Sequence, residues 1–201
     1  MNVNQLAGQQ TYRPDAAAIF FKSRERYGLV SNMTGGMPLL VNQLHFQSSE
    51  GLYQALKFPQ HPDIQERIGS INSGLFAKNV AYSKEYRPHF NKSWWNGDAR
   101  IDATIAILAI KLQQHPEKFG NALRETGDLP IVKRTPTDDD FWGAILQPDG
   151  TVVGGNALGK LLTQLRDALI ELDDPQEAAT EFAGLIAQPS ALYVNRRPLQ
   201  I

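Results

Sequence analysis

The chain has 201 residues, of which 42% are hydrophobic, and this size allows one domain with a complete core. Its 20 basic and 21 acidic residues give a formal net charge of −1, so the molecule as a whole gives no indication of strong non-specific attraction to nucleic acid, although a local basic groove fits the composition. The absence of cysteine excludes disulfides, thiolate nucleophiles and cysteine-bound zinc. The longest apolar run, residues 105–110, is too short to span a bilayer, and residues 1–6 lack the pattern of a secretory signal, so we expect a cytoplasmic protein without a membrane segment.

The first part of the chain contains two candidates for β-structure. Residues 18–21 form a short apolar run of the kind found in buried strands. In residues 38–46, two apolar segments flank Asn42 and Gln43, and Asn is favoured in turns because it tolerates a left-handed backbone. The pattern predicts a β-hairpin whose turn lies at these two residues.

The next segment predicts two helices followed by irregular chain. One helix begins near residue 49 and ends near Pro59, and the second begins at Pro62, a residue that suits the first turn of a helix. Asp63 lies near the positive end of the second helix, where its charge is favourable. Residues 77–95 are aromatic and basic without a clear period, and we expect them to be irregular.

The second half of the chain predicts helices packed around one central element. Residues 100–114 are apolar on nearly every side, which is typical of a fully buried helix. A short helix over residues 116–127 and a strand at residues 129–132 are predicted next. After Asn156 leucines recur at helical spacing, and a further short helix follows Pro175. We therefore predict an α+β fold, mostly helical, in a single domain with a small hairpin-based β-sheet.

Three polar residues lie on one side of the helix predicted near residue 49. Glu50, Gln54 and Lys57 are spaced i, i+4 and i+7, so they stack along one face while the apolar residues between them point to other sides. The acid, the amide and the cation are therefore expected to face the same region of the molecule. In a purely structural interpretation, Glu50 is an acid favoured by the positive end of the helix, and Lys57 extends from the core to water or pairs with an acid.

Three consecutive aspartates precede two aromatic residues and a glycine in the second half of the chain. A carboxyl group beside Phe141 and Trp142 would be partly desolvated, which suits general acid or base catalysis. We select Asp139 from the three, because a run of acids is usually solvated and one or two of them at most face a site. The two aromatic residues also fit as ordinary core anchors.

Five motifs occur in an order that is specific as a set. They are residues 27–32, residues 49–58, Trp95, residues 139–143 and residues 156–162. With these motifs in this order, the chain resembles the NADAR family, also called the YbiA-like family, over roughly residues 19–169. Members of that family cleave N-glycosidic bonds to ribose. The segment Gly-Leu-Val-Ser-Asn-Met, together with the following Gly-Gly-Met-Pro, is similar to the branch that is paired with DarT-type toxins.

The resemblance implies roles for the candidate residues. Glu50, Lys57 and Asp139 are expected to be catalytic, because a carboxylate near the sugar and a proton donor near the departing base both lower the barrier to bond cleavage. In a second route, Lys57 attacks ribose C1′ as a neutral amine and forms a Schiff base with the opened sugar. The expected substrate-binding residues are Gly28, Ser31, Asn32, Tyr53, Gln54, Trp95, Trp142, Gly143 and Asn156.

Some of the expected binding residues offer groups suited to a nucleotide. Trp95 and Trp142 have flat faces on which a base can stack, a contact worth about 1–3 kcal/mol per base, although each also fits as a core residue. Ser31 and Asn32 are expected to hydrogen-bond phosphate or ribose hydroxyl groups. Base and sugar would then be held by different parts of the chain.

Other residues have structural uses that compete with a role in binding. Asn156 fits as the N-cap of the helix that follows it, and Gly28 and Gly143 fit as turn glycines. The four histidines are scattered without metal-ligand spacing. We therefore expect no metal and no cofactor.

One segment combines basic and aromatic residues. Arg87, His89 and Lys92 lie close in sequence to Trp94 and Trp95, a composition that suits contact with a phosphate-bearing polymer or a nucleotide. A solvated surface loop has the same composition. A DNA substrate should need this segment and a small phosphoribosyl substrate should not, so charge reversal at Arg87 and Lys92 would separate these two substrates.

The resemblance implies a specific reaction and partner. We expect an N-glycosidase that hydrolyses the bond between ADP-ribose and guanine in DNA, which makes the protein an antitoxin-like repair enzyme paired functionally with a DarT-type toxin. The alternatives are a hydrolase of phosphoribosylamino-pyrimidine intermediates of the riboflavin pathway and a noncatalytic ADP-ribose-binding module. The expected organisation is an N-terminal extension at residues 1–17, a catalytic domain at residues 18–172, and a C-terminal helix and tail at residues 173–201 packed on that domain.

Overall fold

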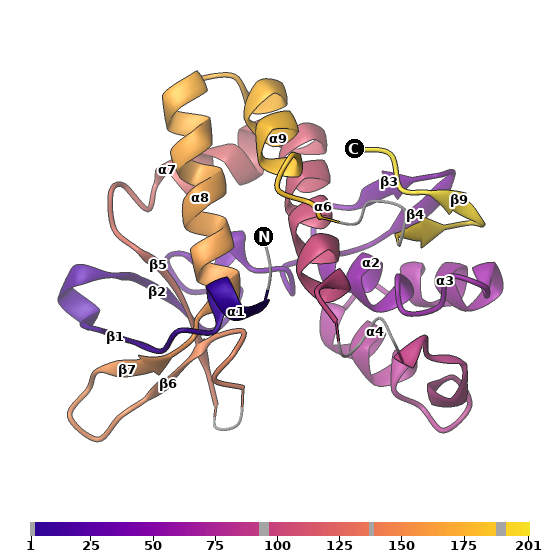
Figure 1. The fold of residues 1–201 in the computed structure, drawn as a ribbon, viewed down its shortest axis with the longest axis horizontal. Coiled ribbons are helices and arrows are strands. Elements are labelled where there is room, and N and C mark those ends of the chain that lie inside the picture. Colours follow the sequence, from indigo (N-terminus) through magenta and orange to yellow (C-terminus); the bar gives the residue numbers. More distant parts are fainter. Residues whose placement is uncertain (1–2, 93–96, 137–138, 188–191) are drawn as a thin grey trace.

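A computed structural model describes residues 3–92, 97–136, 139–187 and 192–201, and its helices and strands are arranged as in Figure 1. The helices are α1 (Val3–Leu6), α2 (Ser49–Ala55), α3 (Pro62–Gly69), α4 (Gly74–Ala81), α6 (Ala99–Gln114), α7 (Asn121–Arg124), α8 (Ala157–Leu172) and α9 (Pro175–Ala183). The strands are β1 (Gln10–Tyr12), β2 (Ala18–Phe20), β3 (Leu39–Val41), β4 (Leu44–Phe46), β5 (Ile131–Thr135), β6 (Ala144–Leu146), β7 (Val152–Gly154), β8 (Tyr193–Val194) and β9 (Arg197–Pro198). The predicted α+β fold class and single domain are confirmed.

The largest sheet has five strands in the order β1-β7-β6-β5-β2. Strands β2 and β5 are parallel, with Phe20 opposite Lys133, whereas β7 pairs antiparallel with β1 and β6. Because β2 and β5 are parallel, their carboxyl ends meet at one edge of the sheet. The segments that follow them, residues 21–27 after β2 and residue 136 after β5, therefore leave from the same edge.

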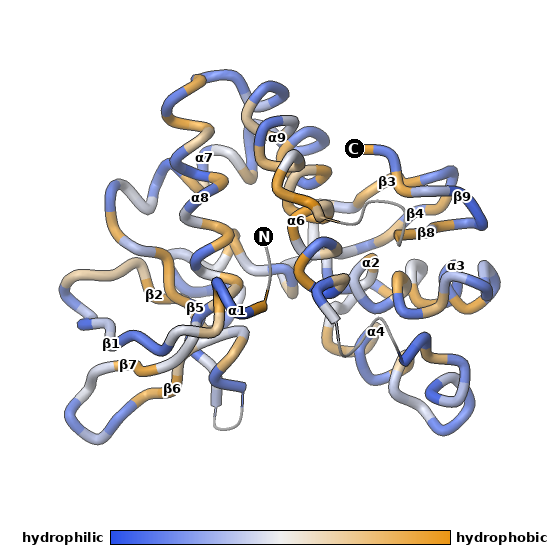
Figure 2. The backbone as a smooth tube through the Cα atoms, viewed as in Figure 1, coloured by the Kyte–Doolittle hydropathy of each residue, from blue (hydrophilic) through white to orange (hydrophobic). Residues whose placement is uncertain are grey.

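Helix α6 lies between two hydrophobic cores, which explains why it is buried nearly all round. Ile101, Ile105 and Leu108 pack into the core formed with α8, α9 and the sheet, whereas Ile107 and Ile110 pack into the core formed with α2, α3 and α4. Figure 1 shows α6 between these two parts of the molecule, and in Figure 2 its tube is largely orange. The prediction of a central buried helix is confirmed.

A buried lysine of α6 fixes the loop that follows β2. Lys111 is fully buried, and its Nζ atom donates hydrogen bonds to the carbonyl oxygens of Ser31 at 3.1 Å and Leu29 at 3.5 Å. The ammonium also lies 4.1 Å from the centre of the Phe119 ring. Burial, reinforced by the positive charge of Lys118, lowers the pKa of Lys111 to about 7. The loop at residues 28–31 is therefore tied to the centre of the fold.

Several elements agree with the sequence patterns. Strand β2 and the hairpin of β3 and β4 are confirmed, and Asn42 and Gln43 form its turn with φ values of 48° and 72°. The hairpin forms a two-stranded sheet of its own. Helices α2, α3, α6, α8 and α9 lie where helical spacing predicts them. Strand β5 begins two residues later than predicted.

One expectation for the middle of the chain is wrong in part. Residues 77–95 are not irregular throughout, because α4 runs from residue 74 to residue 81. The side chain of Ser73 caps this helix by accepting a hydrogen bond from the Phe76 amide at 3.4 Å. Its buried side consists of small residues such as Ala77 and Ala81, whereas Leu75 and Phe76 are exposed. The helix therefore lacks the strong apolar stripe by which helices are recognised.

The two ends of the chain pack against its middle. Strand β1 extends the five-stranded sheet through its pairing with β7, although no strand was expected there. Phe182 of α9 is buried in the core with α8, and Val194 and Leu199 are buried in the core with α2. Among the described residues, no helix is both long enough and apolar enough to cross a membrane.

Candidate active site

The start of α2 is joined to the loop that Lys111 fixes. The Ser48 hydroxyl accepts a hydrogen bond from the Gly51 amide at 3.1 Å, which caps the helix, and the Glu50 amide donates to the Asn32 carbonyl at 3.0 Å. Helix α4 approaches closely, since a Cβ atom at Gly74 would lie 3.0 Å from the Cβ of Glu50. Glu50 is 9% exposed, so its carboxylate lies at the border between protein and solvent.

The predicted polar row of α2 is a continuous hydrogen-bonded chain. The Gln54 amide nitrogen donates to Glu50 Oε1 at 2.7 Å, and Lys57 Nζ donates to Gln54 Oε1 at 2.6 Å. The amide group of Gln54 therefore bridges the acid and the amine, with its nitrogen towards the carboxylate and its oxygen towards the cation. Lys57 Nζ also donates to the Tyr82 hydroxyl at 3.1 Å. These contacts fix both reactive groups relative to one another.

Lys57 lies in an aromatic environment that favours its neutral form. Its side chain is 1% exposed, and Nζ lies 4.5 Å from the ring centre of Tyr82, 5.3 Å from that of Tyr53 and 5.5 Å from that of Phe90. Burial lowers the pKa of Lys57 to about 7, while the Glu50 carboxylate acts in the opposite direction. Near neutral pH, a substantial fraction of this amine is therefore unprotonated and nucleophilic.

The loop after β5 meets α2 through two aromatic rings. Trp142 packs edge-on against Tyr53 with ring centres 6.1 Å apart, and burial together with the Glu50 charge raises the pKa of Tyr53. Asp139 Oδ1 accepts a hydrogen bond from the Trp142 amide at 3.0 Å, and Asp139 Oδ2 lies 3.7 Å from Lys133 Nζ. The Asp139 side chain is 39% exposed and remains accessible to a ligand.

Arg100 brings a cation to the same region. Its guanidinium lies 4.3 Å from the centre of the Phe141 ring, and its charge favours the ionised form of Tyr53. Buried polar atoms normally have hydrogen-bond partners. Within the described chain, however, Arg100 Nε, Asn32 Oδ1 and Ser49 Oγ are buried without one. The Asn32 backbone accepts a hydrogen bond from Glu50, and Arg100 contacts the aromatic residue next to Trp142.

Comparison with known proteins agrees with this arrangement. The sequence model of the NADAR domain matches residues 19–170, which is most of the chain. The chain belongs to the NADAR domain family. Among solved structures, this NADAR protein is similar to the E. coli protein YbiA, determined by NMR, at 26% sequence identity and a TM-score of 0.61, with 79% of this chain and 88% of that chain covered. No curated protein matches the chain.

Membership of the NADAR family gives the general chemistry. Proteins of this family are N-glycosidase-like, so the chain is a hydrolase of N-glycosidic bonds. The NADAR match includes the whole polar row of α2 and the loop that carries Asp139. The groups that such a reaction needs are therefore present within the matched region.

The NADAR fold brings most of the predicted site residues together, but two of them serve the backbone of the neighbouring loop. The Ser31 hydroxyl accepts a hydrogen bond from the Met33 amide at 3.2 Å, and its carbonyl accepts the bond from Lys111. At Gly28 a Cβ atom would overlap the backbone of Lys22 and Ser23. Gly28 therefore permits the close return of the loop that places Asn32 beside Glu50.

Asn156 and Gly143 lie at the junction of the sheet and α8. Asn156 has a φ of 52°, and its side chain accepts from the Lys133 amide at 3.0 Å and donates to the Ile131 carbonyl at 2.9 Å. Both amide atoms therefore bind the backbone of β5, and the side chain does not cap the helix. At Gly143 a Cβ atom would overlap Thr135. These two residues support the Asp139 loop, whereas Trp95 lies outside the described residues.

Two contributors to the site are not evident from the sequence. Tyr82 lies 25 positions after Lys57, beyond the predicted polar helix, and its contact depends on how α4 packs against α2. Burial and the Glu50 charge raise the pKa of Tyr82 to about 12, so its hydroxyl stays protonated at neutral pH. The sequence does not indicate a role for Arg100, because a basic residue near the start of a helix is common on protein surfaces. The stacked Phe141 is what distinguishes it.

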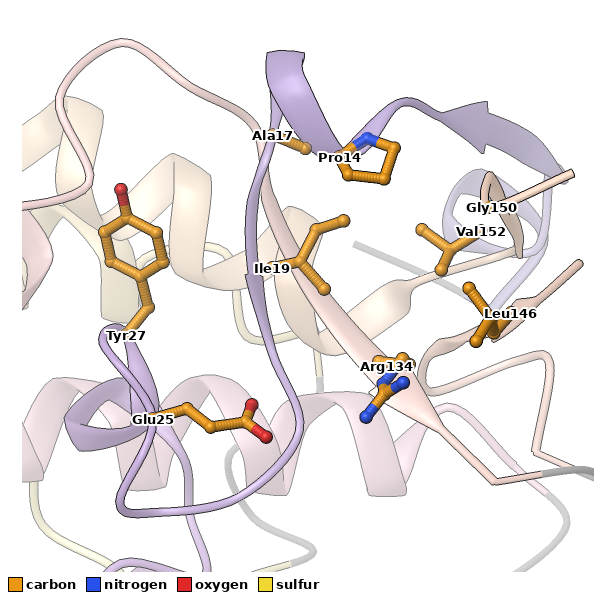
Figure 3. A pocket seen from close by; sticks show the side chains of 9 residues that line it. All are labelled: Pro14, Ala17, Ile19, Glu25, Tyr27, Arg134, Leu146, Gly150 and Val152. Atoms are coloured by element: carbon orange, nitrogen blue, oxygen red, sulfur yellow. The ribbon is translucent and has the colours of Figure 1, made fainter.

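Two cavities of the described residues lie away from the polar row. A cavity of about 310 Å³ lies on the face of the sheet that α8 leaves uncovered, where Arg134, Ile19 and Leu146 line it (Figure 3). Another, of about 430 Å³, is lined by Tyr12, Lys160 and neighbouring residues. Within the described ranges, no three His, Asp or Glu side chains are grouped so that they could hold a metal ion. The polar row is therefore identified by its chemistry.

Proposed function

We propose that this protein hydrolyses the N-glycosidic bond between ADP-ribose and guanine in DNA. The observation that carries the proposal is the Lys57 amine, whose pKa is about 7 and which one amide group connects to the Glu50 carboxylate. Such an amine is a nucleophile at neutral pH, and the adjacent carboxylate stabilises positive charge on the sugar. The substrate in this proposal is the product of a DarT-type toxin, which makes the protein an antitoxin.

Cleavage of the bond requires charge stabilisation at both ends. As the C1′–N bond breaks, positive charge develops on C1′ and negative charge on guanine. Glu50 is assigned to the sugar because its carboxylate borders the buried row, and Asp139 is assigned to the base because its loop carries Trp142. A guanine stacked on Trp142 would place its ring near the more exposed of the two carboxyl groups.

Lys57 supplies a covalent route with a balanced sequence of steps. The neutral amine attacks C1′, the electrons of the C1′–N bond pass to guanine, and guanine takes up the proton that Nζ loses once it is bonded to C1′. The ribose ring then opens to a Schiff base between C1′ and Nζ. Water adds to the Schiff base, which releases ADP-ribose and restores the amine. The Gln54 and Tyr82 contacts orient Nζ throughout.

The test is release of ADP-ribose from a DNA oligonucleotide that carries ADP-ribose on one guanine. Purified protein, Glu50→Gln and a control Glu66→Gln are incubated with it, and free ADP-ribose is followed by mass. Glu66 is an exposed carboxylate on α3, so its amide variant matches the chemical change without touching the site. We expect release by the parent and by Glu66→Gln, and loss of release in Glu50→Gln.

Other outcomes would contradict the proposal in different ways. If Glu50→Gln releases ADP-ribose at the parental rate, Glu50 is not the catalytic carboxylate. If the folded parent binds the oligonucleotide tightly but releases nothing, the protein is an ADP-ribose-binding module. If the parent cleaves only phosphoribosylamino-pyrimidines, the substrate in the proposal is wrong.

A further inference from the structure

Five basic residues gather at the carboxyl edge of strands β2 and β5. Lys22, Arg24 and Arg26 lie in the loop after β2, and Lys133 and Arg134 lie near the end of β5. We call these five residues the edge surface. Because Phe20 is opposite Lys133 in the parallel pairing, the loop and the end of β5 are neighbours in space.

Aromatic rings lie between these cations. The Arg134 guanidinium lies 4.5 Å from the centre of the Phe21 ring, and Lys22 Nζ lies 5.9 Å from the same ring. The guanidinium of Arg26 lies 4.8 Å from the Tyr27 ring. Stacked guanidinium groups keep their outward hydrogen-bond donors free for phosphate. The arrangement combines flat faces with cations, as nucleic-acid-binding grooves do.

Three acids contact the edge surface or its loop, and three of its five cations have no acidic partner among the described residues. Glu25 is partly used by the backbone, since its carboxylate accepts a hydrogen bond from the Phe21 amide at 2.8 Å. Glu125 lies 3.8 Å from Arg26, and Asp139 lies 3.7 Å from Lys133. Within the described residues, Lys22, Arg24 and Arg134 form no ion pair. Among the described acids, Glu25, Glu125 and Asp139 are thus the ones with a hydrogen bond or ion pair to these five cations or their loop.

The edge surface continues into the candidate active site. Lys133 contacts the Asp139 carboxylate, Asp139 binds the Trp142 amide, and Trp142 packs on Tyr53 next to the polar row. On the other face of β5, Arg134 reaches the open cavity of the sheet. Figure 3 shows Arg134 and Leu146 on one side of Ile19, with Glu25 and Tyr27 on the other side.

We propose that the edge surface binds the sugar-phosphate backbone of a nucleic acid on one side of the modified guanine. This inference rests on the proposed function and names the surface that would hold the DNA strand. Backbone phosphates are recognised by clustered Lys and Arg side chains, and aromatic faces accept adjacent bases. Arg87 and Lys92 are exposed beyond Tyr82, so they would contact the strand on the opposite side of the site.

The test compares two charge-reversal variants that differ only in location. Lys22→Glu with Arg24→Glu alters the edge surface, and Arg67→Glu with Arg197→Glu makes the same charge change at exposed positions on α3 and β9. Each protein is assayed for kcat/KM on an ADP-ribosylated oligonucleotide and on a single ADP-ribosylated guanosine nucleotide. Binding of a fluorescent, unmodified oligonucleotide is measured separately by anisotropy over a range of salt.

We expect the edge variant to lower the ratio of oligonucleotide to nucleotide kcat/KM by about tenfold or more. The slope of log Kd against log salt should fall by about 1 for each phosphate contact removed. The Arg67 and Arg197 control should keep the parental ratio and slope. Arg134→Gln, which keeps most of the side-chain shape, should give a smaller change in the same direction.

The possible failures can be told apart. A parental ratio and salt slope in the edge variant, with the parent active, would overturn the edge surface and leave the proposed function intact. An inactive parent whose DNA binding is weakened by the edge variant would overturn the proposed function and support the edge surface. An inactive parent that binds DNA equally well with and without these cations would overturn both.

Discussion

Lys57 and Lys111, the fully buried lysines of the described chain, have similar acidity and different surroundings. Burial is the first cause of the lowered pKa in both, and it brings Lys57 and Lys111 to about 7. Lys111 donates hydrogen bonds to the backbone carbonyls of Leu29 and Ser31. Lys57 instead contacts the side chains of Gln54 and Tyr82.

The charged neighbours of the two amines distinguish a catalytic role for Lys57 from a structural role for Lys111. The next influence on Lys57 is the opposite charge of Glu50, whereas the next influence on Lys111 is the like charge of Lys118. A carboxylate near a neutral amine provides the pair of groups that N-glycosidic cleavage needs. Desolvation therefore yields an unprotonated amine at both places, and the surrounding groups determine whether it serves chemistry or positions a loop.

The largest expected effect is on catalysis. Lys57→Met keeps the length and removes the amine, so we expect release of ADP-ribose to fall about a thousandfold or more. The thermal midpoint should be equal to or above that of the parent, because a poorly solvated cation has been removed. Lys111→Met should retain turnover within about tenfold, since it affects the loop and not the reacting groups. An equal loss of turnover in Lys57→Met and Lys111→Met would contradict the distinction between a catalytic and a structural lysine.

The second effect is the pH dependence of stability. In the native state the pKa of Lys111 is lowered to about 7 from its ordinary value of 10.5, so between these values the unfolded chain binds more protons. Stability should therefore rise as the pH increases from about 7 towards 10.5, and below about 7 the full cost of the buried cation remains. Lys111→Met should flatten this rise by on the order of 2–4 kcal/mol in urea unfolding. An unchanged profile would contradict the lowered pKa.

The third effect separates the lysines by the pH dependence of rate. If the neutral form of Lys57 attacks C1′, kcat should increase about tenfold per pH unit below 7 and level off above it. The relevant pKa of Lys57 is about 7. Lys111→Met should leave the position of this limb unchanged. If the acid limb of the rate profile moved or disappeared in Lys111→Met, the titrating amine would be Lys111 and the assignment to Lys57 would be contradicted.

The smallest effect tests the aromatic partner of Lys57. Tyr82→Phe removes the hydroxyl that lies 3.1 Å from Nζ and keeps the ring beneath it. Losing this acceptor disfavours the ammonium, so the acid limb should move to lower pH and turnover should change by only about two- to tenfold. Tyr86→Phe serves as the control, measured in the same pH series. A limb that moves to higher pH would contradict the assigned hydrogen bond.

The sequence predicts the site residues that are close together in the chain better than those that are far apart in the chain. Glu50 and Gln54 lie on α2, and Lys57 lies two residues after its end at Ala55. The spacing of the three residues alone predicts the polar row that the hydrogen bonds confirm. Asp139 and Trp142 stand out through the run of aspartates beside aromatic residues, but no periodicity links them to α2. Their proximity depends on tertiary packing between Trp142 and Tyr53.

The same limit applies to the fold. Long helices such as α6 and α8 carry enough apolar positions to define a period, so their bounds follow closely from the sequence. Strands β1, β6 and β7 have three residues each and are defined by pairing with distant partners. Helix α4 buries small alanines and exposes Phe76, so its pattern is weak. Short elements are thus determined by their neighbours more than by their own residues.

The most direct test of the central claim is to trap the sugar during turnover. The protein is mixed with ADP-ribosylated oligonucleotide in the presence of borohydride, digested, and analysed for a mass increase on each lysine peptide. We expect a reduced ADP-ribose adduct on Lys57 and none on Lys111. An adduct on Lys111, or no adduct together with a Lys57→Met variant that still turns over, would contradict the assignment of Lys57 as the nucleophile.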